Sequence, residues 1–372
     1  MEYCICRCET KGYYVYNKNF SRILYFSTLE EVVTKYGKEN IKLIKNKKTE
    51  NAFSFPFKIF LDISNFCNLH CKHCLSQSAP ERSEYLDESI IKNIIDECNK
   101  YGIFQIKIGG GEPLLYPRFW KIISYIRKTM PAVRISFTTN GTCLTKKDIA
   151  NIAKMECDVS ISIDGTEKIH NSIRNGNIYN IVSGNISTLL DNNITPVIRY
   201  TLMDDNIGCF MDVYNYCKEK KIILKVRRYK CTSSNEKKLL TYKKDYFELV
   251  KKINNLQYCD IEDIMRRDIN KEKELYCSYD CGAAFRSLHI NCFGDISPCV
   301  FLGEGFKIGN IKKDRIKFLW DNADILKKLR TRGNSVECEN CSRKVICHGE
   351  CLGLKKYYSS GSEIHDPGCM MR

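Results

Sequence analysis

The chain has 372 residues, 43% of them hydrophobic, which is enough for one large domain with a packed core and a smaller second one. Its formal net charge of +15 at pH 7 would by itself suit nucleic acid or an acidic peptide. Its 22 cysteines would suggest disulfides in a small secreted protein, but the length and the lack of an apolar signal-like stretch in residues 1–15 favour a reducing, cytoplasmic setting. No run of about 18 apolar residues predicts a transmembrane helix, so we expect no membrane partner.

Residues 1–55 predict a small α+β segment. Its strands are expected at 12–16, 22–26 and 41–44, and its helix at 29–36. The segment could be a cap on the main domain or a reduced peptide-docking module, and the cap is favoured. Cys4, Cys6 and Cys8 alternate and would share one face of a strand. No fourth ligand stands nearby, so we interpret them as ordinary thiols rather than metal ligands.

Residues 56–235 alternate apolar strand-like runs with amphipathic helical stretches, which predicts α/β architecture with a parallel sheet, a partial (β/α)6 barrel. The strands are expected at 59–63, 104–108, 132–137, 159–163, 196–202 and 222–228. The helices between them are expected at 88–100, 119–129, 146–153, 179–191 and 210–220. In such folds the chemistry gathers at the carboxyl ends of the strands.

Residues 236–275 are highly charged and predict a mostly helical bridge, with a helix at 245–253 and little chemistry. Residues 276–372 carry nine cysteines among Gly and Pro turns. A core of ordinary size does not explain that density, so we expect a cysteine-rich iron–sulfur domain.

Three cysteines, Cys67, Cys71 and Cys74, lie just after the first barrel strand without a fourth nearby. A structural zinc site prefers four protein ligands. A four-iron cluster with three protein ligands instead leaves one iron open to a substrate or cofactor. The spacing therefore favours a reactive iron–sulfur cluster over a structural metal.

The run Gly109-Gly110-Gly111-Glu112-Pro113 follows the second strand, and by itself it could be only a tight strand-to-helix turn. Together with the cysteine loop, it resembles the radical S-adenosylmethionine (radical SAM) superfamily, whose Cys-x3-Cys-x2-Cys loop follows the first barrel strand. The resemblance implies that Gly110, Gly111 and Glu112 receive the amino group of SAM.

The same resemblance implies that Cys67, Cys71 and Cys74 hold a four-iron cluster that binds SAM. The family usually has an aromatic residue before the third cysteine, and here His73 takes that place. We therefore count His73 among the cofactor-binding residues.

Ser162 ends the fourth strand, and Arg174 follows it by twelve residues. Similarity to the peptide-modifying branch of the superfamily places the Ser162 hydroxyl and the Arg174 guanidinium near the ribose and carboxylate of SAM. A guanidinium fork suits a carboxylate, although a capping Ser and a surface Arg would be the structural alternative. Thr139-Asn140-Gly141 ends the third strand and could be only a turn.

The C-terminal cysteines resemble the SPASM domain, which carries two auxiliary four-iron clusters. The chain matches each step of that pattern with Cys281, Gly294, Cys299, Cys338, Cys341, Cys347, Cys351 and Cys369. The resemblance assigns Cys281, Cys299 and Cys351 to the first auxiliary cluster, to which Cys277 could add a fourth ligand. It assigns the second cluster to Cys338, Cys341, Cys347 and Cys369. Zinc is the alternative metal for the Cys-x2-Cys part.

The remaining cysteines are most economically interpreted as buried small hydrophobes. These are Cys98, Cys143, Cys157, Cys209, Cys217, Cys259 and Cys292. Cys231 differs, because it follows the last barrel strand and could face the cavity as a hydrogen-atom donor to a substrate radical. Burial without a role is the alternative for Cys231.

The resemblance covers nearly all of residues 56–372 and implies an oxidoreductase with SAM and three four-iron clusters. Reductive cleavage of SAM would give a 5′-deoxyadenosyl radical that abstracts hydrogen from a peptide. We expect maturation of a ribosomally synthesised peptide by a thioether or carbon crosslink, or by epimerisation. A low-potential donor such as flavodoxin or ferredoxin would supply the electron.

Several alternatives stay open. Sulfatase-maturing relatives have Asp where this chain has Val300, which weakens that alternative. A small-molecule radical dehydrogenase and a non-enzymatic iron–sulfur electron carrier are the others, and the SAM motifs disfavour the carrier. Three clusters would remove roughly five units of positive charge. The remaining basic surface suits an acidic leader peptide, and we expect no nucleic-acid partner.

Overall fold

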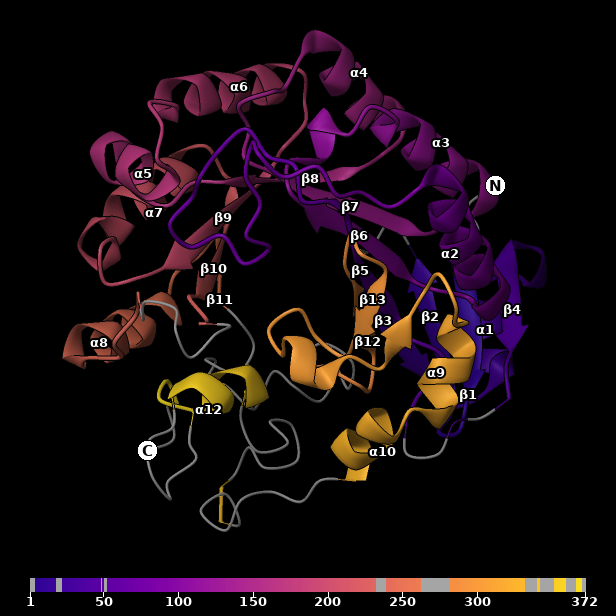
Figure 1. Ribbon diagram of the computed structural model, residues 1–372. Helices are drawn as coiled ribbons and strands as arrows, with labels where there is room; N and C mark the ends of the chain where they lie inside the picture. The colour runs from indigo at the N-terminus through magenta and orange to yellow at the C-terminus, as the bar shows by residue number, and fades with distance from the viewer. Residues whose placement is uncertain are drawn as a thin grey trace.

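The computed structural model describes residues 4–17, 22–47, 49, 52–231, 239–261, 282–331, 340–341, 351–358 and 366–369. In this part of the chain, the strands form one small sheet and one large sheet. Figure 1 shows the large sheet curving around the centre of the molecule with helices along its outer side. None of the helices in the described residues has the length and apolar character needed to cross a lipid bilayer.

The small sheet belongs to the N-terminal segment and has the strand order β3-β2-β1-β4. Its strands are β1 (Cys4–Glu9), β2 (Gly12–Asn17), β3 (Arg22–Phe26) and β4 (Ile41–Lys45). Helix α1 (Leu29–Tyr36) begins at a capping box, in which Thr28 and Glu31 each accept a hydrogen bond from the other's backbone N–H. Cys4 and Cys6 pack with Val15 and Val32 in a separate small core, as expected for ordinary thiols.

The large sheet has the order β11-β10-β9-β8-β7-β6-β5-β12-β13-β14. Its parallel barrel strands are β5 (Lys58–Ser64), β6 (Gln105–Gly110), β7 (Arg134–Thr139), β8 (Asp158–Ser162), β9 (Val197–Leu202) and β10 (Ile223–Arg228). They pair in chain order, which confirms the partial barrel. The sheet does not end with them, because β11 (Cys259–Ile261) pairs in parallel with β10.

The segment expected to be a mostly helical bridge thus holds helix α8 (Lys244–Ile253) and also a barrel strand. On the other side of the sheet, β12 (Ser287–Ile290) pairs in parallel with β5 and continues into β13 (Asp295–Ser297) and β14 (Gly309–Asn310). The C-terminal domain is therefore joined to the barrel by a continuous sheet.

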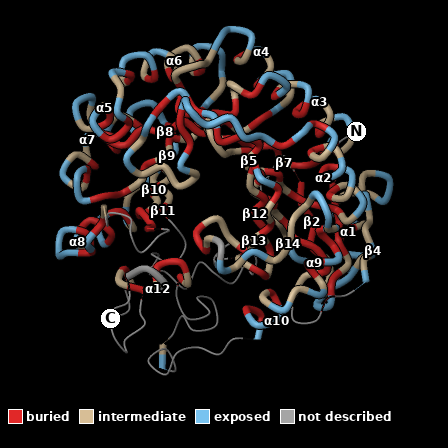
Figure 2. The backbone as a smooth tube through the Cα atoms, viewed as in Figure 1, coloured by how far each residue is buried: buried red, intermediate tan, exposed pale blue. Residues whose placement is uncertain are grey.

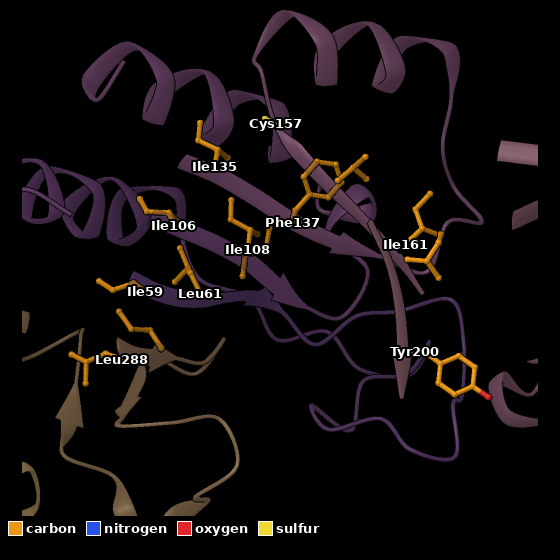
Figure 3. Packing of buried hydrophobic residues seen from close by; sticks show 14 of the residues in the cluster. Ile59, Leu61, Ile106, Ile108, Ile135, Phe137, Cys157, Ile161, Tyr200 and Leu288 are labelled. Atoms are coloured by element: carbon orange, nitrogen blue, oxygen red, sulfur yellow. The ribbon is translucent and has the colours of Figure 1, made fainter. Parts of the chain in front are cut away.

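Helices cover the outer face of the barrel strands (Figure 1). They are α2 (Glu88–Tyr101), α3 (Phe119–Thr129), α4 (Lys146–Lys154), α5 (Glu167–Arg174), α6 (Tyr179–Asp191) and α7 (Phe210–Glu219). Every second strand residue is apolar and buried, as Ile59 and Leu61 show on β5. Figure 3 shows these side chains gathered between sheet and helices, and Figure 2 shows buried residues following the strands.

The N-terminal segment contacts the barrel at the amino ends of its strands. Arg7 is fully buried and donates hydrogen bonds to the carbonyl oxygens of Phe55 (2.7 Å) and Pro56 (3.0 Å). Its guanidinium carbon lies 4.6 Å from the ring centroid of Phe57, which precedes β5. These contacts are those of a cap on the end opposite to the strands' carboxyl ends.

The C-terminal domain includes α9 (Ile316–Asn322), α10 (Asp324–Thr331) and α12 (Leu352–Tyr358). Trp320 of α9 is fully buried and donates from Nε1 to the carbonyl oxygen of Phe53 at 2.7 Å. At the end of β10, Arg228 and Asp366 form a fork of two hydrogen bonds, at 2.7 and 2.6 Å, with both side chains fully buried. This ion pair fixes the C-terminal residues to the barrel.

Candidate active site

The three cysteines of the first motif lie on the loop between β5 and α2, at the carboxyl end of the sheet. Cys67 is buried, whereas Cys71 and Cys74 are partly exposed. Cys71 and Cys74 line a cleft of about 340 Å³ together with Lys72, Tyr229 and Lys230, among others. The cleft therefore runs from the cysteine loop to the end of β10.

Each of the three thiols has an N–H donor near its sulfur. The Asn140 side-chain amide lies 3.8 Å from Cys67 Sγ, and Arg174 Nη1 lies 3.9 Å from Cys71 Sγ. The Ser78 backbone N–H lies 3.2 Å from Cys74 Sγ. Hydrogen bonds of this kind stabilise cluster-bound thiolates and tune their redox potential.

The spacing of the three sulfur atoms suits a cluster better than a single ion. Among the described residues, no three His, Cys, Asp or Glu side chains stand close enough together to hold one metal ion. In a four-iron cluster each cysteine binds a different iron, so the sulfur atoms do not converge on one point.

The glycine run holds the cysteine loop against the sheet by very close backbone contact. Gly111 N–H donates to the carbonyl oxygen of Ser64 at 2.6 Å, and Glu112 N–H donates to that of Phe66 at 2.9 Å. A Cβ on Gly111 would lie 1.9 Å from the Phe66 carbonyl oxygen, and Gly110 has φ of 109°. Only glycine fits both positions.

Glu112 is buried with three hydrogen-bond donors around its carboxylate. They are the Thr139 hydroxyl (2.7 Å), the Asn140 backbone N–H (2.8 Å) and the Leu114 N–H (3.2 Å). Burial raises the pKa of Glu112 to about 7 in spite of these donors and of Arg174. A cation placed beside Glu112 would favour the charged form.

Ser162 ends β8 and is buried, and the nearby Arg174 is the last residue of α5. Both Nε and Nη2 of Arg174 donate to one carboxylate oxygen of Asp164, at 2.9 and 2.6 Å. Arg174 is thus buried and held in place, with Nη1 directed at Cys71. It is not the surface residue of the structural alternative.

Asp164 also contacts His73, whose Nε2 lies 3.4 Å from the same carboxylate oxygen. Burial lowers the pKa of His73 to about 4, more than the nearby Asp164 raises it, so the ring is neutral at pH 7. In the part of the chain that the structure describes, His73 Nδ1 has no hydrogen-bond partner. Asp164, Arg174 and His73 form one buried group behind the cysteine loop.

The cysteines of the second and third sets are described only in part. Cys299 and Cys351 line one pocket, together with Phe301 and Leu302 among others. The Cys351 backbone N–H donates to Asp366 at 3.4 Å, and the Cys369 N–H donates to the Asp366 carbonyl at 3.1 Å. Cys341 is partly exposed. Four of the expected ligands, Cys277, Cys281, Cys338 and Cys347, lie outside the described residues.

Two known families match this chain. The Radical SAM superfamily matches residues 61–217, which hold the cysteine loop, the glycine run and Arg174. The SPASM iron–sulfur cluster-binding domain matches residues 281–342. The chain is a radical SAM protein with a SPASM domain.

Among curated proteins, the mycofactocin maturase MftC of Mycobacterium ulcerans is 26% identical over 333 residues, covering 86% of this chain and 89% of that protein. The antilisterial bacteriocin subtilosin biosynthesis protein AlbA of Bacillus subtilis is 24% identical, covering 82% of this chain and 68% of that protein. Both alignments span the radical SAM and SPASM parts.

Among solved structures, Streptococcus suis SuiB bound to its precursor peptide SuiA has a TM-score of 0.77 at 16% identity, covering 99% of this chain and all of that one. The anSMEcpe structure with bound AdoMet has a TM-score of 0.68 at 19% identity and covers 84% of this chain and 94% of that one. At these identities the likeness shows the fold.

The residues present fit the cofactors that a radical SAM enzyme uses. Three thiols with one N–H donor each suit an iron–sulfur cluster. Glu112 is a buried carboxylate without a lysine or arginine within ion-pair distance among the described residues, and it suits the ammonium group of SAM. The buried Arg174 lies on the other side of Cys71 from solvent.

The other cysteines divide into two groups. Cys98, Cys157, Cys217 and Cys292 are buried as expected, but Cys143, Cys209 and Cys259 are only partly buried. The expectation of burial is therefore wrong for these three, which lie at element ends or, for Cys259, on an edge strand. Cys231 is 1% exposed and follows Tyr229 and Lys230, which line the cleft.

Three residues of the site had no role assigned from the sequence: Asp164, Thr139 and Asn140. Asp164 orients Arg174, Thr139 donates to Glu112, and Asn140 contacts both Glu112 and Cys67. Thr139 and Asn140 stand at the end of β7 and Asp164 follows β8, at the same edge as the motifs. Polar residues at the carboxyl ends of parallel strands were the available signal.

Proposed function

We propose that this radical SAM enzyme matures a ribosomally synthesised peptide by forming a thioether or carbon crosslink, or by epimerisation. The observation that carries the proposal is the placement of three N–H-bonded thiols beside a cleft whose far wall is Tyr229 and Lys230 of β10's end. The cleft is open to a substrate, and a pocket with Cys299 and Cys351 lies in the adjoining SPASM domain.

The chemistry that the cluster and SAM supply when bound is reductive cleavage of SAM to a 5′-deoxyadenosyl radical, which abstracts hydrogen from an unactivated carbon. The protein's own residues bind and orient. Glu112 would hold the SAM ammonium, Ser162 and Arg174 the ribose and carboxylate end, and Gly110 and Gly111 allow the close approach of the backbone.

The proposal assigns the SAM-binding cluster to Cys67, Cys71 and Cys74. Two auxiliary clusters would be held by Cys281, Cys299 and Cys351 and by Cys338, Cys341, Cys347 and Cys369. Cys277 is a candidate fourth ligand of the first auxiliary cluster. A flavodoxin or ferredoxin is the proposed electron donor.

Curated relatives support a peptide substrate. Two of them are named for the maturation of mycofactocin and for the biosynthesis of subtilosin, and a structural neighbour was solved with its precursor peptide. Each alignment covers more than four fifths of this chain. A basic surface, with 59 Lys and Arg against 44 Asp and Glu, suits an acidic leader.

The test is incubation of reduced, anaerobically reconstituted enzyme and SAM with the short peptides encoded beside its gene. Crosslinking should lower the mass of one peptide by the loss of hydrogens. Epimerisation should leave the mass unchanged in ordinary water but incorporate solvent deuterium, and Cys231→Ala should then stall turnover after hydrogen abstraction. Efficient oxidation of a sulfatase-derived peptide, with no reaction of any neighbouring peptide, would overturn the proposal.

Sulfatase maturation is the second candidate, favoured by the fold likeness to anSMEcpe. The residue after Cys299 speaks against it, because Val300 cannot accept a proton as the Asp of sulfatase-maturing relatives can.

A further inference from the structure

The inner face of the barrel sheet, which points away from the helices, carries a group of basic residues. On β5, Ile59 and Leu61 are buried toward the helices, so Lys58 points to the inner face. The register places further cations on that same face. The group, called here the inner cation cluster, consists of Lys58, Lys107, Arg199, Lys225 and Arg227.

The members of the inner cation cluster are close enough to affect one another. Burial lowers the pKa of Lys107 well below its ordinary value, and Arg199, Arg227, Lys58 and Lys225 lower it further. Burial and the same arginines also lower the pKa of Lys58 to about 7. All five are nonetheless partly exposed, so solvent reaches this face. Like charges this close destabilise one another unless an anion lies between them.

The carboxylates of the same face are already engaged. Asp158 pairs with Arg134, Asp260 with Lys225 (3.4 Å), and Asp62 with His289 (2.8 Å). Lys58 and Lys107 form no ion pair with any residue that the structure describes. The inner face thus holds more positive than negative charge.

The inner cation cluster adjoins the cleft at the cysteine loop. Arg199 stands level with Ser162 in the register of β8 and β9, and Arg227 stands one pair nearer the carboxyl end of the sheet. The Arg227 guanidinium carbon lies 5.2 Å from the ring centroid of Phe301, and Lys230 Nζ lies 4.5 Å from the same centroid. Lys230 in turn lines the cleft. A chain entering the cleft would therefore meet these cations next.

We propose that the inner cation cluster binds a carboxylate of the peptide segment that enters the barrel, from an Asp or Glu side chain or from the peptide's C-terminus. The inference rests on the proposed function and names the chemical class of its substrate. A guanidinium accepts a carboxylate in a two-bond fork, and the ammonium groups of Lys58 and Lys107 add point charges below it. The carboxylate neutralises the cluster and fixes how far the peptide enters.

Binding of three short probes to the reconstituted, SAM-loaded enzyme tests the proposal. The probes are acetyl-Ala-Glu-Ala-amide, the neutral acetyl-Ala-Gln-Ala-amide, and acetyl-Ala-Gln-Ala with its C-terminal carboxylate. At least one charged probe should bind about tenfold more tightly than the neutral one, as a charge-assisted hydrogen bond allows. Which one does so distinguishes a side-chain carboxylate from a C-terminal one.

Lys107→Met and Arg199→Met should each remove most of that preference, and Arg227→Gln carries the same test where either variant fails to fold. Lys168→Met is the matched control, because Lys168 is an exposed residue of α5 outside the barrel. It should leave the preference unchanged.

Equal binding of charged and neutral probes by the unaltered enzyme would overturn the inference, as would a preference that survives all of the cluster variants. The proposed function is judged separately, by modification of the neighbouring precursor peptide in the same preparations. If that peptide is modified while the probes show no charge preference, only the inference falls. If the preference is found but no neighbouring peptide reacts, only the proposed function falls.

Discussion

Glu112 links the charge state of the site to the binding of SAM. Its carboxyl group is buried and its pKa is raised to about 7, mainly because burial disfavours the charged form. The donors Thr139, Asn140 and Leu114 hold the group in one orientation. A buried carboxylate whose counter-charge arrives with the ligand binds that ligand more tightly once it has lost its proton.

The affinity of the reconstituted enzyme for SAM should therefore depend on pH. Below pH 7 Glu112 must release a proton before it pairs with the SAM ammonium, so the affinity should fall about tenfold for each pH unit. Above pH 7 it should level off. Equilibrium dialysis from pH 6 to 8 measures this. Glu112→Gln should bind more weakly and with little pH dependence, and an equal pH dependence in that variant would remove Glu112 from the site.

Asp164 bears on stability rather than directly on SAM. Burial acts to raise its pKa, but Arg174 and His73 hold it below the ordinary value. Asp164→Asn leaves Arg174 buried beside a neutral amide and should lower the free energy of unfolding by about 3–5 kcal/mol. Urea unfolding of the enzyme without clusters measures this loss.

The matched control for Asp164→Asn is Asp158→Asn, which breaks a pair with Arg134 whose side chains are 44% and 29% exposed. That change should cost about 1 kcal/mol or less. Equal costs for the two variants would contradict the account of Asp164.

At the residue scale, the sequence motifs predicted most of the site, because cysteines, glycines and Glu112 stand at fixed spacings along the chain. The role of Asp164 could not be predicted in this way. It depends on α5 bringing Arg174 back to the end of β8, ten residues after Asp164, and on a loop from β5 meeting both. Such a contact is a property of tertiary packing.

At the scale of elements, the turn of Gly110 and Gly111 determines where the cysteine loop lies. The backbone of this turn donates to Ser64 and Phe66, so the first strand, the loop and the second strand move as one unit. Because a Cβ on Gly111 would meet the backbone oxygen of Phe66 at 1.9 Å, no side-chain movement can relieve the contact.

Gly111→Ala should displace the cysteine loop and prevent loading of the SAM-binding cluster while leaving the SPASM domain intact. Iron analysis after reconstitution should fall from about twelve to about eight irons per chain. Gly184→Ala is the control, since a Cβ at Gly184 in α6 has nothing within 4 Å. That variant should keep its full iron content, and a full content in Gly111→Ala as well would contradict the argument.

Periodicity predicted the elements well where they are long and amphipathic. Helices α1, α3 and α6 have the bounds that the sequence indicated. Strands β11 and β12 could not be found in this way, because they have only three and four residues and are defined by pairing with β10 and β5. Short strands formed by long-range pairing carry little periodic signal.

At the scale of the whole molecule, the Arg228–Asp366 pair joins the barrel to the residues that bind the auxiliary clusters. Asp366 accepts from the Cys351 N–H with its side chain and from the Cys369 N–H with its carbonyl, while Arg228 holds its carboxylate from β10. The ion pair thus fixes one expected ligand of each auxiliary cluster against the barrel wall.

Asp366→Asn should weaken the auxiliary clusters while sparing the SAM-binding one. Iron content should fall below about twelve per chain, and SAM cleavage should continue without formation of modified peptide. Iron and sulfide analysis and product analysis on the same sample measure both effects. Coupled turnover at the unaltered rate with a full iron content would show that the link is dispensable.

The central claim is that the cysteine loop, the glycine run and Glu112 form a site that cleaves SAM. Its most direct test is the amount of 5′-deoxyadenosine formed by the reduced, reconstituted enzyme, compared with Cys71→Ala prepared in the same way. The account predicts 5′-deoxyadenosine and methionine in equal amounts from the unaltered enzyme and none from Cys71→Ala. No product from a fully iron-loaded enzyme, or undiminished product from Cys71→Ala, would contradict it.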